Sequence, residues 1–132
     1  MTGLDSGFFV ELLKGNNQVV GVWNDLLEGQ DSVVSCVTLY ELKRLGLKGV
    51  IDKAAVDAAL EAITNVCVIS WLDSAGDFDA AASLSHGLGM HMADALILSA
   101  FIKHEAKAIY TTDPDMSLYK KKGVKVILLN GM

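Results

Sequence analysis

The chain of 132 residues is 52% hydrophobic and 20% charged, which excludes a disordered protein and predicts one globular domain over residues 1–132. No apolar run approaches the roughly 20 residues needed to cross a membrane. The apolar stretch Phe8–Leu13 contains Glu11 and has no basic region before it, so we expect neither a signal peptide nor a membrane anchor. The net charge of −5 argues against a protein that binds nucleic acid over its whole surface.

Short apolar segments that favour strands alternate with helical patterns along the chain. The predicted strands are Thr2–Leu4, Val33–Val37, Val66–Ile69, Ala108–Tyr110 and Val124–Leu129. They show no polar alternation, which is typical of strands buried on both faces of a parallel sheet. Apolar residues spaced three and four apart predict helices at Val19–Leu27, Ala54–Ile63, Phe78–Leu88 and Ala93–Phe101. The alternation predicts an α/β domain with right-handed crossovers.

The two cysteines, Cys36 and Cys67, lie in predicted strands, far apart in the sequence and outside any C-x-x-C pair. We expect both to be buried, reduced thiols, as in a cytoplasmic protein, and we expect no zinc site.

Four acidic residues lie where a predicted strand ends or a helix begins. Asp5 follows the first strand and Asp113 follows the fourth. Glu41 lies in the first turns of the helix after the second strand, where the helix dipole favours an anion, and Asp94 opens the helix of Ala93–Phe101. Since α/β sheets bind ligands at the carboxyl ends of their strands, all four acids can face one edge of the sheet.

Four neighbouring carboxylates would repel one another, and some would stay protonated at neutral pH unless a cation neutralised them. Oxygen ligands without histidine or cysteine suit Mg²⁺ and Mn²⁺, which support phosphodiester hydrolysis. Taken singly, each acid could instead be a helix cap or a solvated surface group. Together with Asp115, the four acids account for the whole net charge of −5, so a nucleic-acid substrate is not excluded.

The segments around these acids resemble the ordered signature blocks of PIN-domain nucleases. They are Leu4-Asp5-Ser6, VTLYEL at residues 37–42, ADALI at residues 93–97 and YTTDPDM at residues 110–116. The ADALI block is the most distinctive, and the resemblance runs from residue 3 to about residue 128. The small size of the chain resembles the VapC-type toxins of prokaryotic toxin–antitoxin pairs.

The resemblance implies a three-layer α/β/α domain with a parallel sheet of about five strands in the order 3-2-1-4-5. It also implies an endoribonuclease that depends on Mg²⁺ or Mn²⁺. By position, the catalytic and metal-binding acids would be Asp5, Glu41, Asp94 and Asp113, with Asp115 as an auxiliary ligand.

Other positions of these blocks would support the acids. Hydroxyl groups that would orient carboxylates or water molecules are those of Ser6, Thr38 and Thr111. Two positions depart from the family pattern, since Gly7 replaces a small polar residue and Met116 replaces an aromatic one.

Several cations are candidate contacts for an RNA substrate. Lys43 and Arg44 follow Glu41, and Lys120 and Lys121 follow Asp113, where they could contact phosphate groups. The run Lys120–Lys122 is most simply interpreted as a solvated face near the end of a helix.

Protein partners are also expected. The apolar faces of Phe8–Leu13 and Val19–Leu27 exceed what one small core needs, so we expect a homodimer interface or a groove for a small antitoxin.

Two other interpretations stay open. A PIN-like domain with a degenerate site could bind RNA or protein without catalysis, although all four acids are present. An aspartate-based phosphoacceptor or phosphohydrolase domain also has aspartates at strand ends, but it normally needs a lysine after a later strand.

Overall fold

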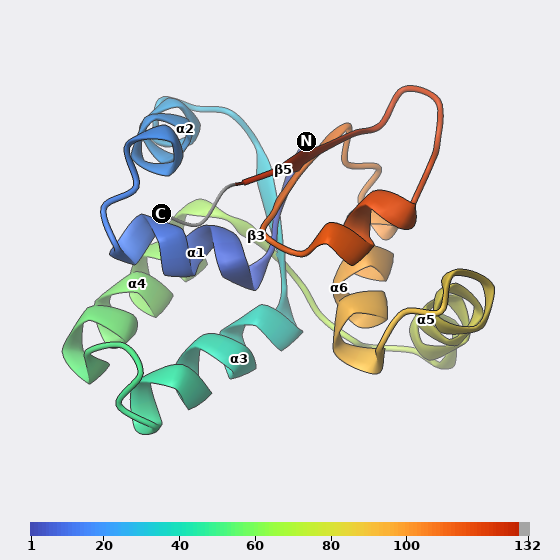
Figure 1. Ribbon diagram of the computed structural model, residues 1–132, viewed down its shortest axis with the longest axis horizontal. Helices are drawn as coiled ribbons and strands as arrows, with labels where there is room; N and C mark the ends of the chain where they lie inside the picture. The colour runs from blue at the N-terminus through green and yellow to red at the C-terminus, as the bar shows by residue number, and fades with distance from the viewer. Residues whose placement is uncertain (130–132) are drawn as a thin grey trace.

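The computed structural model of the protein describes residues 1–129 (Figure 1). The strands are β1 (Thr2–Leu4), β2 (Ser32–Ser35), β3 (Val68–Ser70), β4 (Ala108–Thr111) and β5 (Lys125–Leu128). The helices are α1 (Ser6–Leu13), α2 (Asn17–Leu27), α3 (Cys36–Leu47), α4 (Lys53–Val66), α5 (Ala75–Leu88), α6 (Met92–Lys103) and the 3₁₀ helix η1 (Pro114–Leu118).

The five strands form one parallel sheet in the order β3-β2-β1-β4-β5. Gly3 in the central strand pairs with Val33 of β2 and with Ile109 of β4. The predicted strand order is therefore confirmed. All five strands point the same way, so their carboxyl ends lie along one edge of the sheet.

Helices cover both faces of the sheet and bury a separate apolar cluster on each. On one face, Leu4 and Val34 pack with residues of α1, α2, α3 and α4. On the other face, Val33 and Ile109 pack with α5, α6 and η1. Figure 1 shows α1, α2 and α4 on one side of the sheet and α5 and α6 on the other. These clusters confirm a three-layer α/β/α domain with strands buried on both faces.

The second predicted strand ends earlier than expected. The Ser35 side chain accepts a hydrogen bond of 3.1 Å from the Val37 amide, so helix α3 begins at Cys36. Cys36 is thus a half-buried helical residue, contrary to the prediction of a buried strand position. Cys67 is buried as predicted, but it is the C-cap of α4 and precedes β3. Both cysteines are free thiols, and burial raises the pKa of Cys67.

The apolar stripe predicted on Phe78–Leu88 does lie on a helix, α5, but most of it is not core. Ala81 is the buried residue of this helix, whereas Phe78 is 55% exposed. Together with Met92 of α6, which is 75% exposed, Phe78 lines an apolar hollow of about 570 Å³. Within residues 1–129, no helix has the length and apolar character that a membrane span requires.

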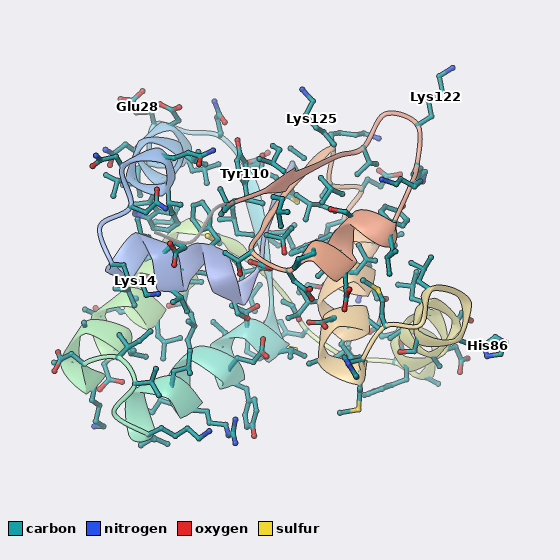
Figure 2. All side chains as sticks on the ribbon, in the orientation of Figure 1. Lys14, Glu28, His86, Tyr110, Lys122 and Lys125 are labelled. Carbon is teal, nitrogen blue, oxygen red and sulfur yellow. The ribbon has the colours of Figure 1, made fainter. Side chains whose placement is uncertain are left out.

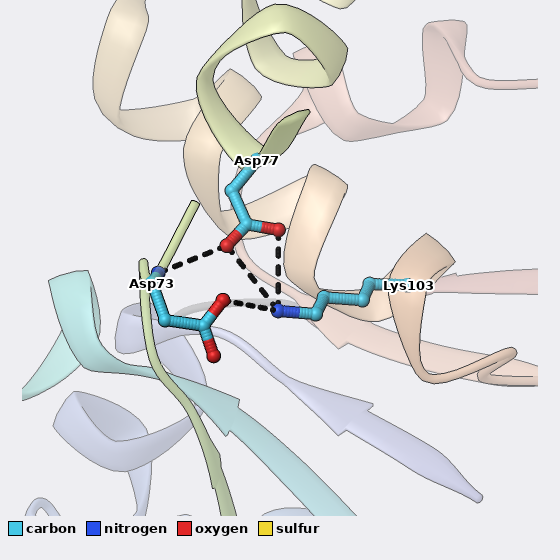
Figure 3. A network of polar contacts seen from close by, with 3 residues as sticks. All are labelled: Asp73, Asp77 and Lys103. Carbon is cyan, nitrogen blue, oxygen red and sulfur yellow. Dashed lines mark hydrogen bonds and ion pairs between the residues drawn. The ribbon is translucent and has the colours of Figure 1, made fainter. Parts of the chain in front are cut away.

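A network of ion pairs connects the start of α5 to the end of α6 (Figure 3). The Lys103 Nζ lies 3.1 Å from Asp77 Oδ1 and 3.4 Å from Asp73 Oδ1, and the Asp73 amide donates to Asp77 Oδ2 at 3.0 Å. The Asp73 amide and Lys103 together lower the pKa of Asp77 to about 2. The network fixes the carboxyl end of α6, and Asp94 lies near the opposite end of the same helix.

Candidate active site

Asp5 lies directly after β1 and forms the N-cap of α1. Its Oδ1 accepts a hydrogen bond of 3.0 Å from the Phe8 amide, and its Oδ2 accepts a hydrogen bond from the Thr111 hydroxyl. The Asp5 amide donates to the Tyr110 carbonyl of β4 at 3.2 Å. Asp5 is only 5% exposed, so its carboxyl is held between the ends of two neighbouring strands.

Thr111 connects Asp5 to Asp113. Thr111 is fully buried, and its hydroxyl oxygen accepts a hydrogen bond of 2.9 Å from the Asp113 amide while the hydroxyl donates to Asp5. Asp113 is the N-cap of η1, and its Oδ1 accepts a hydrogen bond of 2.9 Å from the Asp115 amide. One buried side chain thus fixes the position of both strand-end acids.

Glu41 reaches the site from the first turns of α3. One of its carboxylate oxygens accepts a hydrogen bond of 2.5 Å from the Ser6 hydroxyl, which also forms a 3.0 Å hydrogen bond with the Thr38 hydroxyl. Ser6 is the first residue of α1, directly after Asp5. The three predicted hydroxyl side chains, those of Ser6, Thr38 and Thr111, therefore all contact an acid of the quartet or one another.

Asp94 lies in the first turn of α6. Its pKa is raised to about 6, first by burial, then by the negative charge of Asp113 and a side-chain hydrogen bond with it, and also by Glu41. His91, the N-cap of α6, acts in the opposite direction. The nearby charges of Asp113 and Glu41 thus disfavour the ionised form of Asp94.

The pKa of Asp5 is also raised to about 6. Burial is the main cause, and the charge of Asp113 adds to it, whereas hydrogen bonds from Thr111, Phe8 and the Thr112 backbone oppose it. Asp5 thus interacts with Asp113, which interacts with Asp94, and Asp94 interacts with Glu41. The structure brings the four predicted acids to one edge of the sheet from four different elements.

The acids approach one another pairwise, without a compensating cation. Within residues 1–129, none of the four acids forms an ion pair with lysine, arginine or histidine. In the same residues, no group of three Asp, Glu, His or Cys side chains lies close enough together to form a complete metal-binding site without other ligands. Magnesium needs no such site, because it is usually held by one or two carboxylates together with water and substrate phosphates. The oxygen-only donors, and the mutual repulsion that raises the pKa of Asp94, fit a hard divalent cation.

Gly7 is explained by a close contact that the sequence pattern does not reveal. A Cβ atom at position 7 would lie 1.8 Å from Thr112 Oγ1 and 2.8 Å from Thr112 Cβ. Thr112 precedes Asp113, and its backbone hydrogen-bonds to Asp5. The glycine therefore lets α1 approach the strand end that carries Asp113, which is a positional role that sequence reasoning missed.

The predicted substrate contacts lie in different surroundings. Lys43 forms an exposed ion pair of 2.8 Å with Asp57 of α4, while Arg44 is exposed and forms no ion pair within residues 1–129. Lys120 and Lys121 lie in the loop between η1 and β5. Asp115, the predicted auxiliary ligand, is exposed in the first turn of η1.

Taken together, the fold and the site define a three-layer α/β domain with an acidic cluster at the carboxyl edge of its sheet. The sequence pattern of one family, described as PIN domain, matches residues 4–122. The chain belongs to the PIN-domain family.

Several solved structures have a similar fold. The promoter-bound VapBC2 of Rickettsia felis is 16% identical with a TM-score of 0.73, covering 98% of each chain. A toxin–antitoxin complex from Klebsiella pneumoniae is 17% identical with a TM-score of 0.73, covering 94% of this chain and 95% of that one. VapC20 of Mycobacterium tuberculosis, a toxin that cleaves the sarcin–ricin loop, is 20% identical with a TM-score of 0.64, covering 89% and 93%. At these identities the likeness establishes the fold alone, and curated protein sequences gave no significant match.

Proposed function

We propose that the protein is a metal-dependent endoribonuclease and the toxin of a toxin–antitoxin pair, acting as a single domain in the cytoplasm. The observation that carries the proposal is the convergence of four carboxyl groups, two of them with a pKa raised to about 6, at the ligand-binding edge of a PIN-domain sheet. VapC20, a toxin of similar fold that cleaves the sarcin–ricin loop, favours RNA as the substrate.

In this proposal the four acids have different roles because their surroundings differ. Asp5, Asp94 and Asp113 would hold the principal Mg²⁺ or Mn²⁺, with Asp115 close to Asp113 as an auxiliary group. The bound cation would supply an acidified water and stabilise negative charge on the phosphoryl oxygens. Glu41 would help to hold the cation or position the attacking water, because the Ser6 hydroxyl fixes one of its oxygens and leaves the other for a further hydrogen bond.

Apolar hollows on the surface of residues 1–129 offer sites for protein partners. The first, about 340 Å³, lies between α1, α2 and α4 and is lined by Phe9, Leu13 and Trp23 among others. We assign it to an apolar segment of an antitoxin, because a toxin–antitoxin complex is among the solved structures of similar fold. The second is the hollow of Phe78 and Met92 on α5 and α6, which we assign to a homodimer interface.

The proposed activity is tested by incubating the purified protein with structured and single-stranded RNA. We expect internal cleavage with Mg²⁺ or Mn²⁺ and none with excess chelator. Isothermal titration with Mn²⁺ in the absence of RNA provides a second readout. A protein that neither cleaves any of the RNAs nor binds Mn²⁺ would contradict the proposal and favour a PIN domain that acts by binding alone.

A further inference from the structure

A basic hollow lies between η1 and β5, beyond the acidic cluster. Its volume is about 380 Å³, and its lining includes Ser117, Tyr119, Lys120, Lys121 and Lys122. The hydroxyl groups and ammonium groups are hydrogen-bond donors, and two valine side chains complete the lining. Figure 2 shows Lys122 and, on β5, Lys125 extending outward from this side of the molecule.

The lysines of this hollow are not neutralised by the protein itself. Elsewhere on the described chain, Lys14, Lys43, Lys53 and Lys103 form ion pairs with acids, whereas the isolated Lys48, Lys107 and Lys125 form none. Within residues 1–129, no ion pair involves Lys120–Lys122. Glu105 lines an adjoining smaller hollow with Lys107 and Lys121, so cations outnumber acids there as well. On a chain of net charge −5, three adjacent unpaired ammonium groups form a local positive potential.

The basic hollow is connected to the acidic cluster by a short, anchored segment. Asp113 caps η1, Met116 of η1 is buried in the core, and Ser117 already lines the hollow. At about 2 Å of rise per residue of 3₁₀ helix, the four steps from Asp113 to Ser117 span roughly 8 Å. Lys120–Lys122 lie beyond Ser117, in the loop that leads to Lys125, which pairs with Ala108 at the start of β4. A polyanionic strand with one phosphate at the acids would therefore reach these lysines with a phosphate several nucleotides away.

We propose that this basic hollow binds backbone phosphates of the RNA strand several nucleotides from the phosphodiester that is cleaved, using Lys120, Lys121 and Lys122. The inference rests on the proposed function, and it adds a route for the strand from the acidic cluster along η1 to the loop before β5. Phosphate contacts of this kind position the strand without reading its sequence. They also offset the repulsion between the polyanion and the acidic remainder of the surface.

The test compares RNA binding by two variants with the same change in charge. Lys120→Ala/Lys121→Ala removes two ammonium groups of the hollow, and Lys48→Ala/Lys53→Ala removes two near the α3–α4 connection. Both are placed in an Asp94→Asn background with Mg²⁺ present, so that the RNA stays intact. Fluorescence anisotropy with a labelled single-stranded RNA of about ten nucleotides then gives Kd over a range of salt concentrations.

We expect the hollow variant to raise Kd about tenfold at 0.1 M salt. The slope of log Kd against log salt concentration should fall by about 1.4, the value expected when two phosphate contacts to a single strand are lost. The control variant should leave both quantities within about twofold of the parent. Equal effects of the two variants would overturn the hollow as a specific subsite, while cleavage by the wild-type protein would leave the proposed function standing. If the wild-type protein neither cleaves nor binds RNA, the proposed function fails and the hollow fails with it.

Discussion

Replacing Asp5 by Asn should make the protein more stable at neutral pH while removing its proposed activity. The folded-state pKa of Asp5 is about 6, against 3.8 for an unperturbed aspartate, and the carboxyl is only 5% exposed. A folded pKa above the unfolded one means that the folded protein binds the proton more tightly. The contribution of Asp5 to stability is therefore fully present below pH 4 and is lost as pH rises from about 4 to about 6.

The shift of about two pKa units corresponds to about 3 kcal/mol of destabilisation at pH 7.5 when no cation is bound. Asparagine avoids this penalty and still caps α1, because its side-chain oxygen can accept from the Phe8 amide. The Thr111 hydroxyl loses its charged acceptor, which costs about 1 kcal/mol. The net expectation is a gain of about 1–2 kcal/mol at pH 7.5, from these two terms.

Urea unfolding of both proteins at pH 4.5 and pH 7.5, in chelator, measures this gain directly. The advantage of Asp5→Asn should be present at pH 7.5 and disappear or reverse at pH 4.5, where Asp5 is already protonated in the folded protein. With saturating Mn²⁺ the wild type should recover stability, and the variant should recover less. A variant that is destabilised equally at both pH values would refute the reasoning that a buried, uncompensated carboxylate destabilises this site.

Three further perturbations test other parts of the site and the fold. Gly7→Ala should lower the urea midpoint by an amount equivalent to about 1–3 kcal/mol and slow RNA cleavage, because the added Cβ would displace Thr112. The control is Gly21→Ala, at an exposed helical position with open space around it, which should be neutral or stabilising. Thr111→Val removes the hydroxyl that donates to Asp5, so it should raise the pKa of Asp5 further and reduce metal-dependent cleavage. A pH–rate profile and a Mn²⁺ titration measure these effects. An unchanged pH–rate profile would contradict the role of this hydroxyl. Asp77→Asn should lower thermal stability at pH 7 but not at pH 2. The ionised Asp77 carboxylate stabilises the wild-type fold above pH 4, and this contribution is lost as pH falls toward 2. The same loss of stability at both pH values would contradict the ion-pair explanation.

The site residues whose positions could be predicted are those that come directly after a strand in the sequence. Asp5 and Asp113 come immediately after β1 and β4, and the carboxyl ends of parallel strands must share an edge. The strand order was predicted from the family resemblance, because local patterns do not specify which strands are neighbours.

Contacts between distant segments could not be predicted in the same way. Ser6 and Glu41 are 35 residues apart, and their hydrogen bond depends on how α3 packs beside α1. Lys43, predicted as a substrate contact, lies within an ion pair with Asp57 because α4 packs along α3. The need for glycine at position 7 arises from Thr112, which is more than a hundred positions away in the sequence.

Periodicity also fails where a surface has no partner within the chain. The spacing of apolar residues predicted that α5 would bury a stripe, and the helix formed, but Phe78 is mostly exposed. A helical period indicates which residues share a face, but it does not indicate whether another element of the same chain covers that face.

The central claim is that the four acids form one metal-dependent catalytic site, and the rate of RNA cleavage by Asp94→Asn tests it most directly. Asp79→Asn is the matched control, since Asp79 is an exposed aspartate on α5 outside the site. With Mg²⁺ or Mn²⁺ at saturation, we expect the Asp94→Asn rate to fall at least about a hundredfold and the control to retain the wild-type rate. Equal cleavage rates for wild type and Asp94→Asn would contradict the claim.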